Sequence, residues 1–347
     1  MSEPKKTTSE NAPNRRTWMF WVLLGAILII LPFLSPSNFF THSLVLMLVF
    51  AYTGVAWDLL GGYAGQLSLG HSVYFGIGAY CAVLLAEHFG IPPWASMAIA
   101  ALLAAAVAFI FFYPTFRFGL IGPFFTLTTI GVAAIFALVV ANIEPLGGAQ
   151  GVMLPMKDAG LYWLQYFDER IYYFVGLVML ALIVGISAFV RRSRLGYQLV
   201  AVREDEAAAE ACGINVGLCK MQITALSAAL TAVGGVLYAQ VITFVDPTVF
   251  AVNMAVTIAV VPIVGGSGVL LGPLVGSIVL TAISNSIQLS VGAVVPGLNL
   301  FVYGALLIIV VLMMPEGIAP RIAQLCGRIH HDKSRTGAEK KGRGAIE

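Results

Sequence analysis

Charged side chains are scarce in this chain, and their scarcity sets its class. Only 10% of its 347 residues are Asp, Glu, Lys or Arg, whereas a soluble domain carries about 25%. Hydrophobic residues make up 59% of the chain, and the mean hydropathy is +0.91. The composition excludes an ordinary water-soluble domain and indicates an integral membrane protein.

Several site types are also missing. The sequence contains no G-x-x-x-x-G-K-[ST] loop, the motif that cradles the phosphates of ATP. The cysteines show no C-x-x-C spacing and fall within a predicted span or on the cytoplasmic side, where thiols stay reduced: Cys81, Cys212, Cys219 and Cys326. We therefore expect no disulfide, no bound metal and no cofactor, and no segment resembles a nucleic-acid-binding module.

Carboxylates deep in the membrane are lacking as well. A carrier driven by protons or sodium usually needs such a group within its spans. Asp58, Glu87, Glu144 and Asp246 all fall near the ends of apolar segments. The energy for any transport is therefore expected to come from elsewhere.

Long apolar segments dominate what remains. About 20 apolar residues are needed to cross the hydrocarbon core as a helix, and the segments lack the alternation of membrane barrels. We predict an all-α integral membrane protein with about ten transmembrane helices, some of them broken by glycine-rich segments. The windows fall at 18–34, 39–59, 66–86, 94–113, 123–141, 171–190, 220–242, 250–264, 269–290 and 298–314.

Basic residues predict the orientation of these spans, because Lys and Arg gather in cytoplasmic loops. With both termini cytoplasmic, all of the 19 Lys and Arg residues except Lys157 and Arg170 lie inside. This places a polytopic membrane domain at 18–318, with an inner loop at 191–219 and an outer loop at 142–170. Residues 1–17 are predicted to be a disordered cytoplasmic tail. Residues 319–347 form a basic cytoplasmic tail, whose charge sets topology or, alternatively, holds anionic membrane lipid.

Two glycine-rich interruptions stand out within the apolar windows, at 61–80 and 261–278. Broken spans in the two halves of a transporter often mark the translocation path, and polar residues inside a span tend to face a protein interior or water. The candidate path residues are Gly65, Gln66, Ser68, His71, Gly265, Gly266 and Gly268. The alternative is that glycines only let helices approach, which we favour for Gly272 and Gly276.

The inner loop holds a charged segment with signals for a short helix. Asp205 suits the N-cap position, good helix formers follow, and Gly213 is placed to end the helix. One face is expected to carry Arg203, Glu206 and Glu210. The opposite face carries only small side chains, which another protein can approach closely: Ala207, Ala208 and Ala211. The alternative is an amphipathic loop helix lying on the membrane surface.

Six stretches of sequence, in order from about residue 45 to 318, carry a resemblance to a known family. VREDEAAAEACGIN resembles the EAA coupling loop of ABC importer permeases. GYAGQLSLGHSVYFGIGAY, GPFFTLTTIG and LGGAQGV precede it, while SAALTAVGGVLYAQVITFVDPTVF and IVGGSGVLLGPLVGS follow. Together they resemble LivM-type permeases of branched-chain amino-acid ABC importers. The sequence departs from the general pattern in that Glu206 lies one residue further from Gly213, and Pro262 stands where an aliphatic residue is expected.

The resemblance implies a non-enzymatic transport subunit in the bacterial inner membrane. ATP and Mg²⁺ would be bound by two separate ATP-binding cassette subunits, and a second related permease would complete the pore. A periplasmic substrate-binding protein would deliver a branched-chain amino acid, which crosses by alternating access. The coupling to the ATPase would be carried by Arg203, Glu204, Asp205, Glu206, Ala208, Glu210 and Gly213.

Other functions remain open from the sequence. Relatives of this permease type import urea, short amides or aromatic acids, and no residue identifies the cargo. A stand-alone secondary carrier or facilitator would transport without ATP. A membrane enzyme acting on lipid or isoprenoid groups would need an acidic or histidine cluster at one membrane surface, and the only charged cluster found is the one between Arg203 and Glu210.

Overall fold

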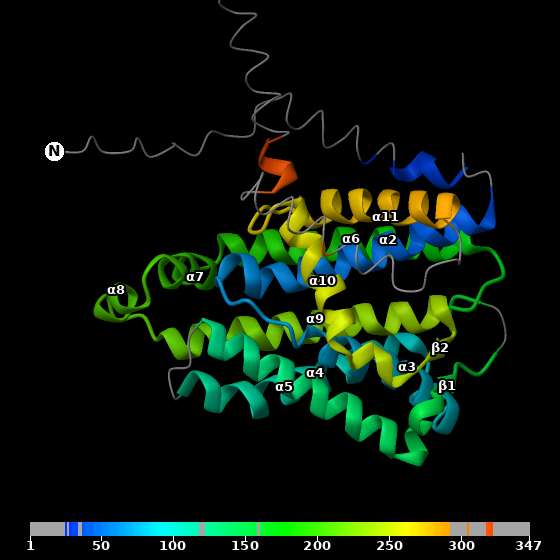
Figure 1. Ribbon diagram of the computed structural model, residues 1–347, viewed down its shortest axis with the longest axis horizontal. Helices are drawn as coiled ribbons and strands as arrows, with labels where there is room; N and C mark the ends of the chain where they lie inside the picture. The colour runs from blue at the N-terminus through cyan, green and yellow to red at the C-terminus, as the bar shows by residue number, and fades with distance from the viewer. Residues whose placement is uncertain are drawn as a thin grey trace, which may run out of the picture.

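The computed structural model describes residues 25, 28–33, 37–117, 122–157, 160–291, 304 and 317–321. Helices account for most of this part of the chain (Figure 1). The long helices are α2 (Asn38–Asp58), α3 (His71–His88), α4 (Pro93–Arg117), α5 (Pro123–Asn142), α6 (Glu169–Arg192), α9 (Val216–Ile242), α10 (Val252–Gly265) and α11 (Gly272–Val291). The shorter ones are α7 (Arg194–Glu204) and α8 (Glu206–Ala211), with single turns η1 (Leu31–Phe33), η2 (Leu59–Tyr63), η3 (Glu144–Leu146), η4 (Gly148–Gln150) and η5 (Pro247–Phe250).

The long helices form two packed groups. In one, α2 lies between α6 and α11; in the other, α9 packs against both α3 and α4. The groups meet where α2 contacts α9, and α10 crosses between them (Figure 1). Consequently α2 is the most buried of the long apolar helices, whereas α4, α5 and α6 expose broad apolar faces, as expected for helices that face lipid.

Five described helices are long and apolar enough to cross a membrane: Asn38–Tyr63, Pro93–Arg117, Pro123–Asn142, Glu169–Arg192 and Val216–Ile242. A helical membrane protein is therefore confirmed, while the count of about ten spans and the cytoplasmic termini stay predictions. The predicted window 298–314, the polar tail 1–17 and most of 18–34 and 319–347 lie outside the described residues. The predicted window 66–86 was wrong at its start, because the chain is not helical before His71.

Glycine permits the closest helix contacts. A Cβ atom on Gly78 would overlap the carbonyl of Ala232, and one on Gly235 would overlap the carbonyl of Phe75, so α3 and α9 touch backbone to backbone. At the contact between α10 and α11, a Cβ on Gly276 would overlap the carbonyl of Val261. The packing role favoured for Gly276 therefore agrees with the structure.

Two short strands lie at one end of the bundle. Strand β1 (Val152–Met153) pairs antiparallel with β2 (Phe244–Val245) and so ties the loop before α6 to the end of α9. Helices α7 and α8 project at the opposite end (Figure 1). We refer to these as the outer and inner ends, following the orientation predicted from basic residues.

The backbone contact between α3 and α9 generates a stability prediction. Gly235→Ala should destabilise the protein by about 1–3 kcal/mol, because the added methyl group overpacks a closed contact. Gly185→Ala is the matched control, since Gly185 also lies within a helix and a Cβ there meets nothing within 4 Å. The midpoint of thermal unfolding in detergent should fall for the first variant and hold or rise for the second. Equal midpoints would show that the close contact between α3 and α9 does not contribute to the stability of the protein.

Candidate functional site

The first glycine-rich interruption is an irregular segment held by side chains from three helices. After α2 the chain makes one π-helical turn, η2, and then has no regular secondary structure from Ala64 to Gly70. Trp57 Nε1 donates a hydrogen bond to the carbonyl of Ser68 at 2.7 Å. On the α5 side, Thr126 donates to the carbonyl of Leu67 at 2.8 Å, and Thr129 Oγ1 accepts from the Leu69 amide at 3.0 Å. These bonds satisfy peptide groups that a helix would otherwise pair.

His71 fixes the end of this segment from inside the bundle. Its side chain is fully buried, with Nδ1 3.0 Å from Ser68 Oγ and Nε2 2.8 Å from Ser227 Oγ. Ser227 donates its only hydroxyl proton to the carbonyl of Ala56 at 2.6 Å, so it accepts from Nε2–H. Ser68 Oγ is the hydrogen-bond partner of Nδ1. This network joins α2, α3 and α9 around the break.

The second interruption meets the first at Asp58. Helix α10 ends at Gly265, and the loop to α11 contains two glycines with positive φ, Gly266 at 122° and Gly268 at 78°. The amide of Gly268 donates to Asp58 Oδ1 at 2.9 Å. A Cβ on Gly62 would overlap both the Asp58 carboxylate and the Gly268 amide. The two broken helices are therefore in direct contact, and glycine is required where they meet.

Arg203 joins the charged inner segment to this contact. It lies in the last turn of α7, and its Nη1 donates to the carbonyl of Gly62 at 2.5 Å. The stem of the side chain passes over Gly65, where a Cβ would come within 3.1 Å of Arg203 Cγ. The guanidinium also lies beside Gly268, with Nη1 3.2 Å from the position of a Cβ there. One side chain thus contacts both interruptions.

Most of the candidate path residues are buried in this structure. Gly265 and Gly266 are buried, as are Gln66, Ser68 and His71, whereas Gly65 is exposed and Gly268 is half-buried. No observation tests their role in translocation, which stays a prediction.

The predicted helix in the charged segment is present as α8. Asp205 is its N-cap and accepts from the Ala208 amide at 3.0 Å. Gly213 has φ 83°, its amide donates to the Glu210 carbonyl at 2.9 Å, and the Ile214 amide donates to the Ala209 carbonyl at 3.1 Å. This pair of bonds is a Schellman ending. The face predicted to meet another protein is exposed at Ala207, Ala208 and Ala211.

The prediction that Arg203, Glu206 and Glu210 share one helix face was wrong for Arg203. The backbone turns at Asp205, with φ −159° and ψ 113°, so Arg203 belongs to α7 and points back to the bundle. Glu206 instead forms an ion pair with Lys220 at 2.6 Å, while Glu210 is exposed, as is Glu204. The cause is the capping preference of Asp205 itself, which interrupts one helix to begin the next.

Lys220 is a site residue that the sequence interpretation missed. Its side chain is only 3% exposed, and it lies in the second turn of α9 with Nζ 6.0 Å from the centre of the Phe116 ring. A lone lysine just inside an apolar window was the available signal, but nothing in the spacing identified Glu206 as its partner. Among the described residues, no group of three or more His, Cys, Asp or Glu side chains is placed to hold a metal ion.

A helical membrane bundle whose broken helices meet inside, with an exposed charged helix at one end, has the architecture of a membrane transport subunit. The family described as branched-chain amino acid transport system / permease component matches residues 39–311. The chain belongs to this family.

Curated relatives agree with this assignment. The high-affinity branched-chain amino acid transport system permease protein LivM of Escherichia coli strain K12 is 26% identical over 326 residues, covering 87% of this chain and 75% of the relative. LivM of Salmonella typhimurium is 24% identical over the same shares. The probable ABC transporter permease protein YphD of E. coli is 33% identical over 163 residues, covering 44% of this chain and 46% of the relative. No solved structure matches the chain.

The ion pair between α8 and α9 generates a prediction. Glu206→Ala should destabilise the protein by roughly 1–3 kcal/mol, because it leaves the buried Lys220 ammonium without its partner. Adding Lys220→Met should recover most of the loss, since a buried charge is then no longer present. Thermal unfolding of the purified protein checks both variants.

Glu210→Ala is the control for this pair, because it removes an exposed carboxylate from the same helix. If Glu206→Ala and Glu210→Ala unfold at the same temperature, the ion pair contributes nothing to the docking of α8.

Proposed function

We propose that this chain is a non-catalytic membrane-spanning subunit of an ATP-driven importer for branched-chain amino acids. The family match and the names of the LivM relatives support this substrate class. ATP and Mg²⁺ are held by two ATP-binding cassette subunits, a second related permease completes the pore, and a periplasmic binding protein delivers the substrate. The complex lies in the bacterial inner membrane.

The observation that carries the proposal is the contact of Arg203 with the two broken helices. The exposed face of α8 provides a surface for an ATP-binding subunit, and α8 is joined directly to α7. Movement of this pair acts on the Gly62 carbonyl through Arg203, and Gly62 lies against Asp58 and Gly268. Closure of the ATP-binding subunits thereby reaches both interruptions through one hydrogen-bonded side chain.

The first test is the composition of the native complex. We expect the tagged chain, purified from its own membranes in mild detergent, to bring with it ATP-binding subunits and a second permease, identified by mass spectrometry. Recovery of the chain alone, with transport activity in vesicles lacking ATP, would contradict the proposal and favour a stand-alone carrier.

Replacement of Arg203 tests the coupling route. Arg203→Gln should reduce ATP-driven uptake of leucine by at least about fivefold, the range of a coupling free energy of 1–3 kcal/mol, because the bond to Gly62 is weakened. Recovery of the partner subunits should be unchanged, since the exposed face of α8 is intact.

Arg194→Gln provides the matched control, because Arg194 is an exposed arginine at the other end of α7. Uptake by the two variants at the same level would argue against Arg203 as the coupling contact.

A further inference from the structure

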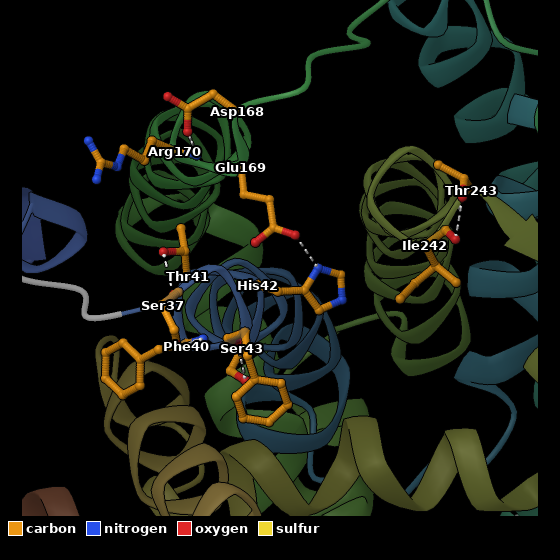
Figure 2. Close-up of polar contacts among 11 residues, drawn as sticks. Ser37, Phe40, Thr41, His42, Ser43, Asp168, Glu169, Arg170, Ile242 and Thr243 are labelled. Atoms are coloured by element: carbon orange, nitrogen blue, oxygen red, sulfur yellow. Dashed lines mark hydrogen bonds and ion pairs between the residues drawn. The ribbon is translucent and has the colours of Figure 1, made fainter.

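A cavity of about 230 Å³ lies at the outer end of the bundle, far from the coupling contact. Its walls come from the start of α2, the start of α6 and the end of α9, including His42, Glu169, Tyr172, Gln240 and Thr243. Figure 2 views this region with α2, α6 and α9 around it and shows the imidazole of His42 reaching toward Glu169. The proposed coupling route through Arg203 does not involve this cavity.

Two buried oxygen atoms from the cavity walls have no hydrogen-bond donor within the part of the chain that the structure describes. His42 Nδ1 meets Glu169 Oε1 at 3.1 Å, but Glu169 Oε2 is buried and unpartnered. Gln240 is 2% exposed, and its Oε1 is likewise unpartnered. A buried acceptor without a donor costs about 1–3 kcal/mol. Both residues line the cavity, and a ligand that supplies donors there would satisfy the two oxygens.

The nearby protein cation does not supply them. Arg170 follows Glu169 in sequence, but Figure 2 shows its guanidinium on the side of α6 away from His42. A primary ammonium group fits the requirement, because it carries three donors on one positively charged atom. The carboxylate of Glu169 offsets that charge.

A second cavity adjoins the first and extends the site toward the outer loop. It has a volume of about 280 Å³ and shares Tyr166, Phe167, Tyr172 and Thr243 with the first. Leu154, Met156, Lys157 and Gln165 complete its lining. Its aromatic and aliphatic walls suit an apolar side chain, and the Lys157 ammonium suits a carboxylate. Each cavity is smaller than the about 300–1,000 Å³ typical of drug-sized ligands, which favours a small solute.

We propose that these outer cavities bind a small apolar amino acid, whose ammonium group donates hydrogen bonds to Glu169 and Gln240. This deepens the proposed function, on which the identity of the ligand as transported cargo rests. The site would hold the amino acid at the outer end of the bundle before it reaches the broken helices.

The test measures binding without transport. The full chain, in nanodiscs of phosphatidylglycerol, is incubated with radiolabelled L-leucine and competitors. We expect 3-methylbutylamine, which keeps the ammonium and the branched chain, to displace leucine, and N-acetyl-leucine, which lacks the ammonium, to fail. Equal displacement by both compounds would overturn the proposal.

Two variants locate the site. Glu169→Gln should weaken leucine binding at least tenfold, and Gln240→Met should weaken it independently while preserving the size of the side chain. Glu144→Gln, an exposed carboxylate in the same outer region, should bind normally. A monodisperse elution profile identifies the folded variants, and normal binding by either folded cavity variant would overturn the assignment.

An ethanolamine headgroup offers the same ammonium chemistry, and changing the lipid separates the two sources. Leucine should bind equally in nanodiscs containing phosphatidylethanolamine, whereas a large loss of affinity there would assign the cavity to lipid and overturn the amino-acid proposal. The two proposals also fail differently. If leucine binds as expected but the purified complex does not transport it, the importer proposal fails while the cavity assignment stands. If the complex transports leucine and Glu169→Gln binds it like Glu144→Gln, only the cavity assignment fails.

Discussion

The structure depends on how it pairs the backbone groups of the irregular segment between α2 and α3. In hydrocarbon an unpaired peptide group costs several kcal/mol, so a spanning chain leaves the helical form only where other groups replace the lost hydrogen bonds. Trp57 and Thr129 bond the segment directly, and His71 holds Ser68 through its hydroxyl. These side chains come from helices α2, α5 and α3, so the break exists only in the assembled bundle.

The same break provides both the acceptor and the space for the side chain of Arg203. A carbonyl released from regular helix pairing, that of Gly62, becomes the acceptor for a guanidinium from a segment 141 residues away. The surrounding positions lack side chains at Gly62, Gly65 and Gly268, which leaves room for the arginine stem and for the approach of Asp58. The break after α2, the three glycines and the side chain of Arg203 therefore depend on one another at the inner end of the bundle. The outer end is fixed separately, by the strand pair and by the contact between His42 and Glu169.

Local rules predicted some of these features well. Asp205 and Gly213 carry their own capping signals, so α8 was predicted from spacing alone. Polar residues among apolar ones marked the segment from Gln66 to His71 as unusual, although periodicity could not place the start of α3. The bond from Arg203 to Gly62 and the ion pair of Glu206 with Lys220 were beyond such rules, because both depend on how helices pack in three dimensions. The same holds for the contact of Glu169 with His42, which joins α6 to α2 and is not indicated by the neighbours of either residue in the sequence.

The length of α9 has a consequence for the bilayer itself. Its 27 residues extend about 40 Å at 1.5 Å per residue, beyond the about 30 Å of a typical hydrocarbon core. A helix that exceeds the membrane in this way tilts or protrudes. Lys220 near its first turn and Gln240 near its last therefore sit at the two margins of the lipid, and a change in membrane thickness would alter the tilt that positions both.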